Sequence, residues 1–163
     1  MRWPQRFGLK KIRLVIVVGP RCKGQGANMV GYSGKPLHQK LGLKAGTVLC
    51  LKNAPADYEK LLGPGQPENL EITSRISARV GIYHVFEKNR SELERIARRL
   101  RDHMAADAAL WISWPKKSSG VATDLTEDVL REILLPMGYV DIKVCAVSET
   151  WSGLKFVIRK SQR

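Results

Sequence analysis

The sequence has few cysteines and no long hydrophobic run. Its three cysteines are an odd number without the spacing of a zinc site, so they argue against a disulfide framework or a metal site and fit a reducing cytoplasm. Apolar runs such as residues 14–18 (Leu-Val-Ile-Val-Val) are far shorter than the roughly 20 residues that a membrane-spanning helix needs. We therefore expect a cytoplasmic protein without a metal ion and without a membrane partner.

Residues 1–28 contain no acidic residue. Their seven basic residues give this segment a charge of +7, and the remaining chain, with 21 basic against 15 acidic residues, contributes the other +6 of the total +13. The short apolar stretch ends at Gly19 and Pro20, which does not suit a secretory signal peptide. Two interpretations of this basic leader remain: a flexible, disordered arm that touches anions, or a stretch translated only because the start codon was placed too early. We favour the second, because Met29 opens a segment of different character.

Hydrophobic residues make up 44% and charged residues 26% of the 163 residues. This composition is typical of a globular protein and excludes a wholly disordered or collagen-like chain. The length favours one domain, which we assign to residues 29–163. The excess of positive charge favours an anionic partner, either a small molecule or a nucleic acid.

Strand and helix patterns alternate along residues 36–158. Apolar segments predict strands at 47–51, 70–73, 80–86, 108–114, 140–147 and 154–158. Helical patterns occupy 36–43 and 57–62, and capping boxes at 91–94 (Ser-Glu-Leu-Glu) and 124–127 (Asp-Leu-Thr-Glu) predict the starts of two longer helices. This order predicts a three-layer, Rossmann-like α/β fold, with a mostly parallel sheet and a C-terminal antiparallel hairpin strand.

Two groups of residues carry a resemblance to known families. A helix ending in Lys-Leu-Gly-Leu at 40–43, followed by Gly-Thr-Val-Leu at 46–49 and a closing antiparallel strand, resembles class I S-adenosylmethionine-dependent methyltransferases over about residues 36–160. Residues 31–37 (Gly-Tyr-Ser-Gly-Lys-Pro-Leu), 114–117 (Trp-Pro-Lys-Lys), 120–128 and 151–155 (Trp-Ser-Gly-Leu-Lys) resemble a family of uncharacterised bacterial proteins that carry a domain of unknown function. The second resemblance implies no known activity.

The sequence departs from the methyltransferases at the positions that bind their cofactor. In that family the first strand ends in an acidic residue followed by alternating glycines, which let the cofactor approach the backbone closely. Here those positions hold Cys50, Lys52, Ala54 and Ala56. Thr73 and Ser74 stand where the resemblance implies an acidic residue for the cofactor ribose, and residues 74–79 are too few for a helix, a strand and another helix. We therefore expect a degenerate methyltransferase-like sheet that lacks one strand and binds no cofactor.

Polar and aromatic residues are expected to gather at the carboxyl ends of the strands. Ligands of open parallel sheets bind at this edge, and unpaired amides at a helix start attract anions. The residues that we place there are Lys52, Asn53, Lys116, Lys117, Ser118 and Trp151. The lysines and amides predict a site for a phosphate-bearing anion, and Trp151 offers a flat face to a base or a sugar.

No set of residues in the sequence predicts catalysis. His38, His84 and His103 lie on separate predicted elements, and none has a visible serine, cysteine or carboxylate partner. Cys50 and Cys145 lie in predicted strands and are interpreted as small buried hydrophobic residues. We name no catalytic residue and favour a non-catalytic ligand-binding or interaction module. A divergent methyltransferase or other transferase and a nucleic-acid-binding protein stay open as alternatives, and so does the oligomeric state.

Overall fold

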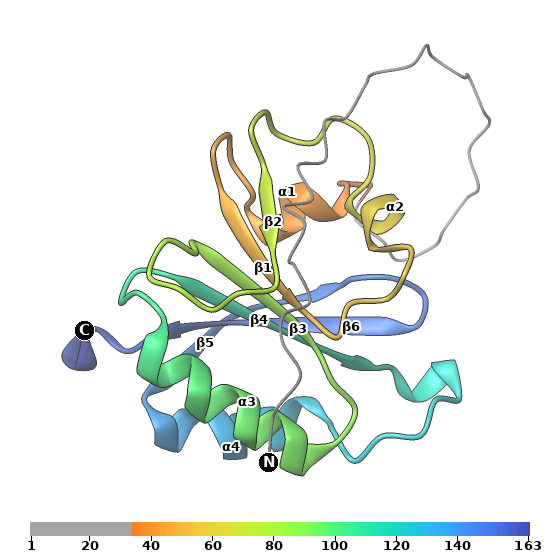
Figure 1. Cartoon of the computed structure of the whole chain (residues 1–163). Coiled ribbons are helices and arrows are strands. Elements are labelled where there is room, and N and C mark those ends of the chain that lie inside the picture. The colour runs from red at the N-terminus through yellow and green to blue at the C-terminus, as the bar shows by residue number, and fades with distance from the viewer. Residues whose placement is uncertain (1–33) are drawn as a thin grey trace, which may run out of the picture. The chain divides into compact units, whose positions relative to one another are not determined.

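Six strands form one sheet in residues 34–163, the part of the chain that the computed structural model describes (Figure 1). The interpretations of residues 1–28 lie outside the described residues. The strands are β1 (Val48–Lys52), β2 (Glu71–Thr73), β3 (Ile82–Phe86), β4 (Ala109–Pro115), β5 (Tyr139–Ala146) and β6 (Trp151–Ile158). They lie in the order β2-β1-β3-β4-β6-β5, in which the first four are parallel and β6 is antiparallel to both of its neighbours. The predicted parallel sheet with a C-terminal antiparallel hairpin is confirmed.

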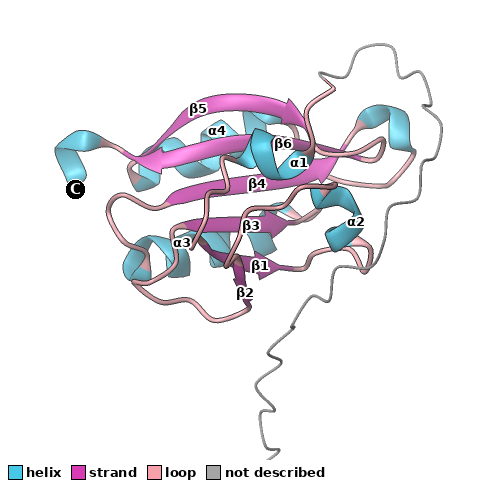
Figure 2. Ribbon diagram, turned by 90° about the horizontal axis from the view of Figure 1, so that it is seen from above, coloured by secondary structure: helices cyan, strands magenta, loops and turns pink. Residues whose placement is uncertain are grey.

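Helices cover both faces of this sheet. The longer helices α3 (Arg90–His103) and α4 (Glu127–Leu134) lie on one face, and the short helices α1 (Leu37–Leu41) and α2 (Tyr58–Leu62) lie on the other (Figure 2). Single-turn helices η1 (Lys117–Ser119), η2 (Leu135–Met137) and η3 (Lys160–Gln162) complete the described elements. Within residues 34–163, no helix has the length and apolar character to cross a membrane.

Two apolar clusters, one on each face, hold the layers together. The α3/α4 cluster includes Leu93, Leu100 and Leu130, which pack against Leu110 and Phe156 of the sheet. The α1/α2 cluster is built around Leu37, Leu41, Tyr58, Leu62, Phe86 and Trp111. Every residue of β3 and of β4 is buried, which explains why these strands are apolar on both faces apart from His84 and Ser113, instead of alternating between apolar and polar residues.

The sheet is reduced between β2 and β3. β2 has only three residues, and turns and bends lead from it to β3 without a helix or a further strand in this part of the structure. The sheet that residues 34–163 form therefore has six strands, as the shortness of residues 74–79 predicted.

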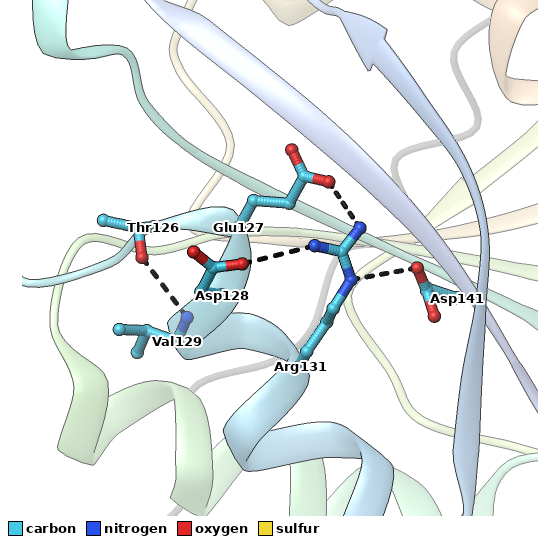
Figure 3. Close-up of polar contacts among 6 residues, drawn as sticks. All are labelled: Thr126, Glu127, Asp128, Val129, Arg131 and Asp141. Atoms are coloured by element: carbon cyan, nitrogen blue, oxygen red, sulfur yellow. Dashed lines mark hydrogen bonds and ion pairs between the residues drawn. The ribbon is translucent and has the colours of Figure 1, made fainter.

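Both predicted capping boxes are wrong. α3 begins at Arg90, so Ser91 lies inside its first turn and is not the N-cap residue. The N-cap residue is Asn89, and its side chain makes no capping hydrogen bond. Instead the Arg90 amide donates to Asp124 Oδ1 at 2.7 Å, from the loop ahead of α4. α4 begins one residue after Thr126, whose Oγ1 accepts a hydrogen bond from the Val129 amide at 3.2 Å (Figure 3). Asp124 thus caps the other helix, because a carboxylate at a helix N-terminus can come from any loop that reaches it.

Arg131 ties α4 to the last strand pair. Its guanidinium contacts the carboxylates of Glu127, Asp128 at 3.4 Å and Asp141 at 3.1 Å (Figure 3). Asp141 belongs to β5, and a β-bulge between Asp141 and Lys143 interrupts the pairing of β5 with β6. The arginine therefore holds the edge strand next to the bulge.

We predict that Asp124→Ala lowers the free energy of unfolding by about 1 kcal/mol, the usual cost of losing an N-cap. Urea denaturation of the two variants Asp124→Ala and Ser91→Ala measures this. Ser91→Ala should stay within about 0.5 kcal/mol of the wild type, because an exposed position away from a cap contributes little. A larger loss for Ser91→Ala than for Asp124→Ala would contradict the assignment of the cap.

Candidate functional site

A cleft lies at the carboxyl edge of the sheet. It follows the ends of β1 and β3 and the start of β6, which reaches the same edge because Trp151 pairs with Pro115 at the end of β4. The cleft has a volume of about 350 Å³ and is lined by Asn53, Phe86, Glu87, Lys88, Val121 and Trp151. We call it the carboxyl-edge cleft. Its position is the one where ligands of open parallel sheets bind.

The Glu87 carboxylate is the fixed charge of this cleft. Glu87 follows β3 directly and is only 8% exposed. Its Oε2 accepts from Asn53 Nδ2 at 2.9 Å, and its Oε1 accepts from the amides of Lys88 at 2.9 Å and Asn89 at 3.2 Å. A carboxylate has about four acceptor positions. Three are used inside the protein, which leaves acceptor capacity for a ligand.

The loop that follows β1 brings Asn53 to this carboxylate. Asn53 has φ of +53°, a left-handed conformation that asparagine tolerates better than most residues. The turn at Asn53 directs its side-chain amide toward Glu87. The contact thus joins the ends of the neighbouring parallel strands β1 and β3.

Aromatic and apolar side chains form the rest of the wall. The rings of Phe86 and Trp151 meet edge to face, with centroids 5.1 Å apart and planes at 86°. Val121, which is 39% exposed, comes from the loop ahead of α4. That loop is held against the β3–α3 connection because Thr123 Oγ1 donates to Lys88 O at 2.8 Å. The cleft therefore combines an apolar wall with a carboxylate.

A hydrogen-bonded row of three polar side chains lies in the core on the face of the sheet that α1 and α2 cover. Tyr58 Oη is 2.8 Å from His84 Nδ1, and His84 Nε2 is 2.7 Å from Ser113 Oγ. Neither His84 nor Ser113 is exposed. Burial lowers the pKa of His84 to about 3 and raises the pKa of Tyr58 above its ordinary value. The imidazole is therefore neutral near pH 7, and the serine cannot reach a substrate in this conformation.

The expectation that His84 lacks a serine partner was wrong. His84 in β3 and Ser113 in β4 are separated by 29 residues, and the register of the two parallel strands brings them together. No local spacing in the sequence reveals such a pair. Among residues 34–163, no group of three or more histidine, cysteine or acidic side chains could hold a metal ion.

Two of the six predicted site residues, Asn53 and Trp151, line the carboxyl-edge cleft. Lys52 instead donates from Nζ to Ser74 O at 2.6 Å, between the ends of β1 and β2.

The other three predicted residues belong to the connection after β4. Lys116 donates from Nζ to Ser148 O at 2.7 Å, which joins this connection to the β5–β6 turn. Lys117 and Ser118 lie exposed in η1 and are not among the residues that line the cleft.

Sequence reasoning missed Glu87, Phe86 and Val121 as lining residues. The signal for Glu87 was its place directly after the mainly apolar segment 80–86, where a carboxylate meets the end of the sheet. Val121 had no signal, because only the tertiary contact of its loop with Lys88 brings it to the cleft.

A second cleft of about 320 Å³ lies on the other side of Trp151. It is lined by Pro55, Asp57, Leu61, Ser148, Glu149, Thr150 and Trp151. Asp57 and Glu149 give this second cleft two carboxylates. The carboxyl edge therefore carries acidic side chains as well as the lysines from which the sequence predicted an anion site.

The loop after β1 does not have the form that the methyltransferase resemblance implies for S-adenosylmethionine. Residues 50–57 contain no glycine, and Lys52, Ala54 and Ala56 carry side chains at the positions expected for close backbone approach. The hydrogen bond of Lys52 to Ser74 O lays its side chain between the ends of β1 and β2, where the resemblance implies the cofactor ribose. These residues differ from the family's pattern at the positions that the resemblance assigns to the cofactor.

No family model matches this chain, and no curated protein matches it. Solved structures do resemble it. A protein proposed to be a type 11 methyltransferase, from Sulfolobus solfataricus, has a TM-score of 0.54 at 12% identity over 78% of this chain and 92% of its own. A protein from Bordetella parapertussis proposed to be exported has a TM-score of 0.53 at 10% identity, with 76% of this chain and 65% of that one covered.

PigF, in a structure with SAH, has a TM-score of 0.50 at 7% identity over 69% of this chain and 56% of its own. At such identities the likeness shows the fold alone. Residues 34–163 have a methyltransferase-like fold, as the resemblance implied.

The burial of neutral His84 predicts a pH dependence of stability. The folded-state pKa of about 3 lies below the ordinary value of 6.5, so below pH 6.5 the unfolded chain binds a proton that the folded chain does not. The stability that depends on His84 is fully present above pH 6.5 and falls toward pH 3, by at most about 1.4 kcal/mol per pH unit. Urea denaturation of the wild type and of His84→Gln at several pH values measures this loss. It equals the difference between the two proteins in how the free energy of unfolding changes with pH.

His103→Gln is the matched control, because His103 is an exposed histidine at the end of α3. As the pH is lowered, the free energy of unfolding of this variant should fall in parallel with that of the wild type. Parallel curves for His84→Gln and the wild type would show that His84 is protonated in the folded protein.

Proposed function

We propose that this chain is a non-catalytic ligand-binding module on a degenerate methyltransferase-like scaffold, and that the carboxyl-edge cleft binds a nucleoside phosphate or a similar small phosphate-bearing molecule. The observation that carries the proposal is the buried Glu87 carboxylate, which is held in position by Asn53 and two backbone amides and stands beside two aromatic rings.

The carboxylate selects for a hydrogen-bond donor. Ionised Glu87 can only accept hydrogen bonds, and its position is set before any ligand arrives. A ribose hydroxyl or an exocyclic amine of a base supplies such a donor, whereas a phosphate at the same place would be repelled. The phosphate is therefore assigned to another part of the cleft.

The rings of Phe86 and Trp151 supply a surface for a planar group. Trp151 is partly exposed and lines the cleft, and stacking of a base on an aromatic side chain contributes about 1–3 kcal/mol. A cleft of about 350 Å³ is within the range typical of small-molecule sites.

Lys88 supplies the positive charge for a phosphate. It lines the cleft next to Glu87 and is exposed, so its ammonium can meet a phosphate at the mouth while the donor end of the ligand points to the carboxylate. A ligand with a donor, a planar ring and a phosphate uses all three features, which favours a nucleotide over inorganic phosphate.

The described nucleophiles support a binding role. Ser113 is fully buried against His84. Cys50 is buried in β1, and burial raises the pKa of its thiol, which disfavours the reactive thiolate. A divergent methyltransferase is the second candidate, favoured by the fold and disfavoured by the loop after β1. Fold alone is weak support for chemistry.

Isothermal titration with nucleoside monophosphates and the matching nucleosides tests the proposal. We expect Glu87→Gln to weaken the binding of both by about tenfold or more, since a hydrogen bond to a charged group contributes about 1.5–3 kcal/mol. Trp151→Leu should weaken both as well, through lost stacking. Lys88→Gln should weaken the monophosphate and leave the nucleoside unchanged.

Glu149→Gln is the control, because it removes a carboxylate from the second cleft and leaves the carboxyl-edge cleft intact. Thermal melts verify that each variant folds. The proposal fails if neither ligand class binds the wild type at millimolar concentration, or if Glu149→Gln weakens binding as much as Glu87→Gln.

S-adenosylmethionine should bind poorly. Lys52 places a side chain and a positive charge close to where the cationic sulfonium would lie in the family's manner. Titration of the wild type in the same experiment measures the dissociation constant. A value in the low micromolar range, about −8 kcal/mol, would favour the divergent methyltransferase instead.

A further inference from the structure

A cluster of three lysines lies on the α1 side of the β5–β6 hairpin. Lys143 of β5 is directly opposite Lys155 of β6. Lys155 pairs on its other side with Trp111 of β4, which belongs to the α1/α2 cluster. The two lysines therefore project from the same face of the sheet as α1, which lies in front of this hairpin in Figure 2.

Lys40 of α1 completes the cluster. Its Nζ donates to Ala146 O at 3.2 Å, and Lys143 Nζ donates to Lys40 O at 3.5 Å. Helix α1 and the β5–β6 hairpin, which are about 100 residues apart in the sequence, thus bring three lysines to one surface. We call it the hairpin lysine surface.

Lys143 and Lys155 place two positive charges directly opposite each other. Like charges directly opposite each other on paired strands destabilise a sheet. None of the ion pairs between residues 34 and 163 includes Lys143 or Lys155. Asp141, the acidic residue of β5, is used by Arg131 of α4 on the opposite face of the sheet. Repulsion between the two lysines would be relieved by an anion that binds them from outside.

We infer that the hairpin lysine surface binds the phosphate backbone of a nucleic acid. None of its three lysines lines either cleft. An extended polyanion can lie across Lys143, which is exposed, and across Lys40 and Lys155, which are partly exposed. Binding of this kind is independent of base sequence, since phosphate contacts position a nucleic acid without reading it.

The sequence carries further positive charge ahead of α1. The described chain begins at Gly34, close ahead of α1, and residues 1–28 add a charge of +7 with no acidic residue. The chain that leads into Lys40 is therefore itself attractive to a polyanion. This inference does not depend on the nucleotide site, because it uses different residues.

Fluorescence anisotropy of a labelled 20-nucleotide single-stranded RNA, titrated with the full chain at several KCl concentrations, tests the inference. The double variant Lys143→Gln/Lys155→Gln should bind more weakly, and the slope of log K against log salt should fall by about 1.4, because each phosphate contact to a single strand contributes about 0.7. Thermal melts check that the variant folds.

The charge-matched control is Arg98→Gln/Arg99→Gln on the exposed side of α3, which covers the opposite face of the sheet. Its slope should equal that of the wild type. An equal loss of slope in the arginine variant, or an unchanged slope in the lysine variant, overturns the inference. So does a result in which the lysine variant loses binding only to vesicles of anionic phospholipid.

Discussion

The fold depends on two strands that are covered on both faces. β3 and β4 are buried along their whole length, so every polar group in them must find a partner inside the protein. Trp111 meets this requirement by donating from Nε1 to Leu41 O at 3.2 Å, and His84 meets it through Tyr58 and Ser113. In residues 34–163 no buried polar side-chain atom lacks a partner. These bonds fix where the short helices α1 and α2 sit, although neither helix has enough length to be stable alone.

The charged residues at the carboxyl edge are used first to hold the loops there. Lys52 and Lys116 bind carbonyl oxygens of distant segments, and Glu87 binds two successive amides of its own loop. Such bonds stabilise backbone groups that would otherwise be unpaired where strands end. The consequence for function is that Glu87 keeps a set direction, whereas Lys52 and Lys116, two of the three lysines that the sequence suggested for an anion, bind backbone carbonyl oxygens.

The architecture was predictable from the sequence because apolar strand segments are local patterns. The strands of the central sheet differ from the predicted segments by only a residue or two at most ends, and the missing strand followed from the shortness of residues 74–79. The capping boxes were not predictable in this way, because Asp124 caps a helix 34 residues earlier in the chain.

The candidate site shows the same limit. Asn53 and Trp151 were placed correctly at the edge by strand order alone. The meeting of Asn53 with Glu87 depends on the side chains of two strand ends, 34 residues apart. Local spacing carries no information about such a pair, and it also could not indicate that the Lys116 side chain turns to Ser148.

The bulge in β5 has a consequence for how the molecule behaves in a crowded solution. β5 is the last strand of the sheet, and Ile142, at the bulge, is 58% exposed. A straight, apolar edge strand is a template on which another chain can add its own strand, which is how ordered aggregates grow. The bulge breaks the regular row of backbone donors and acceptors at the residue whose side chain is most attractive to such a strand. The edge is therefore protected by its shape, while its exposed side chains stay available to a partner that does not extend the sheet.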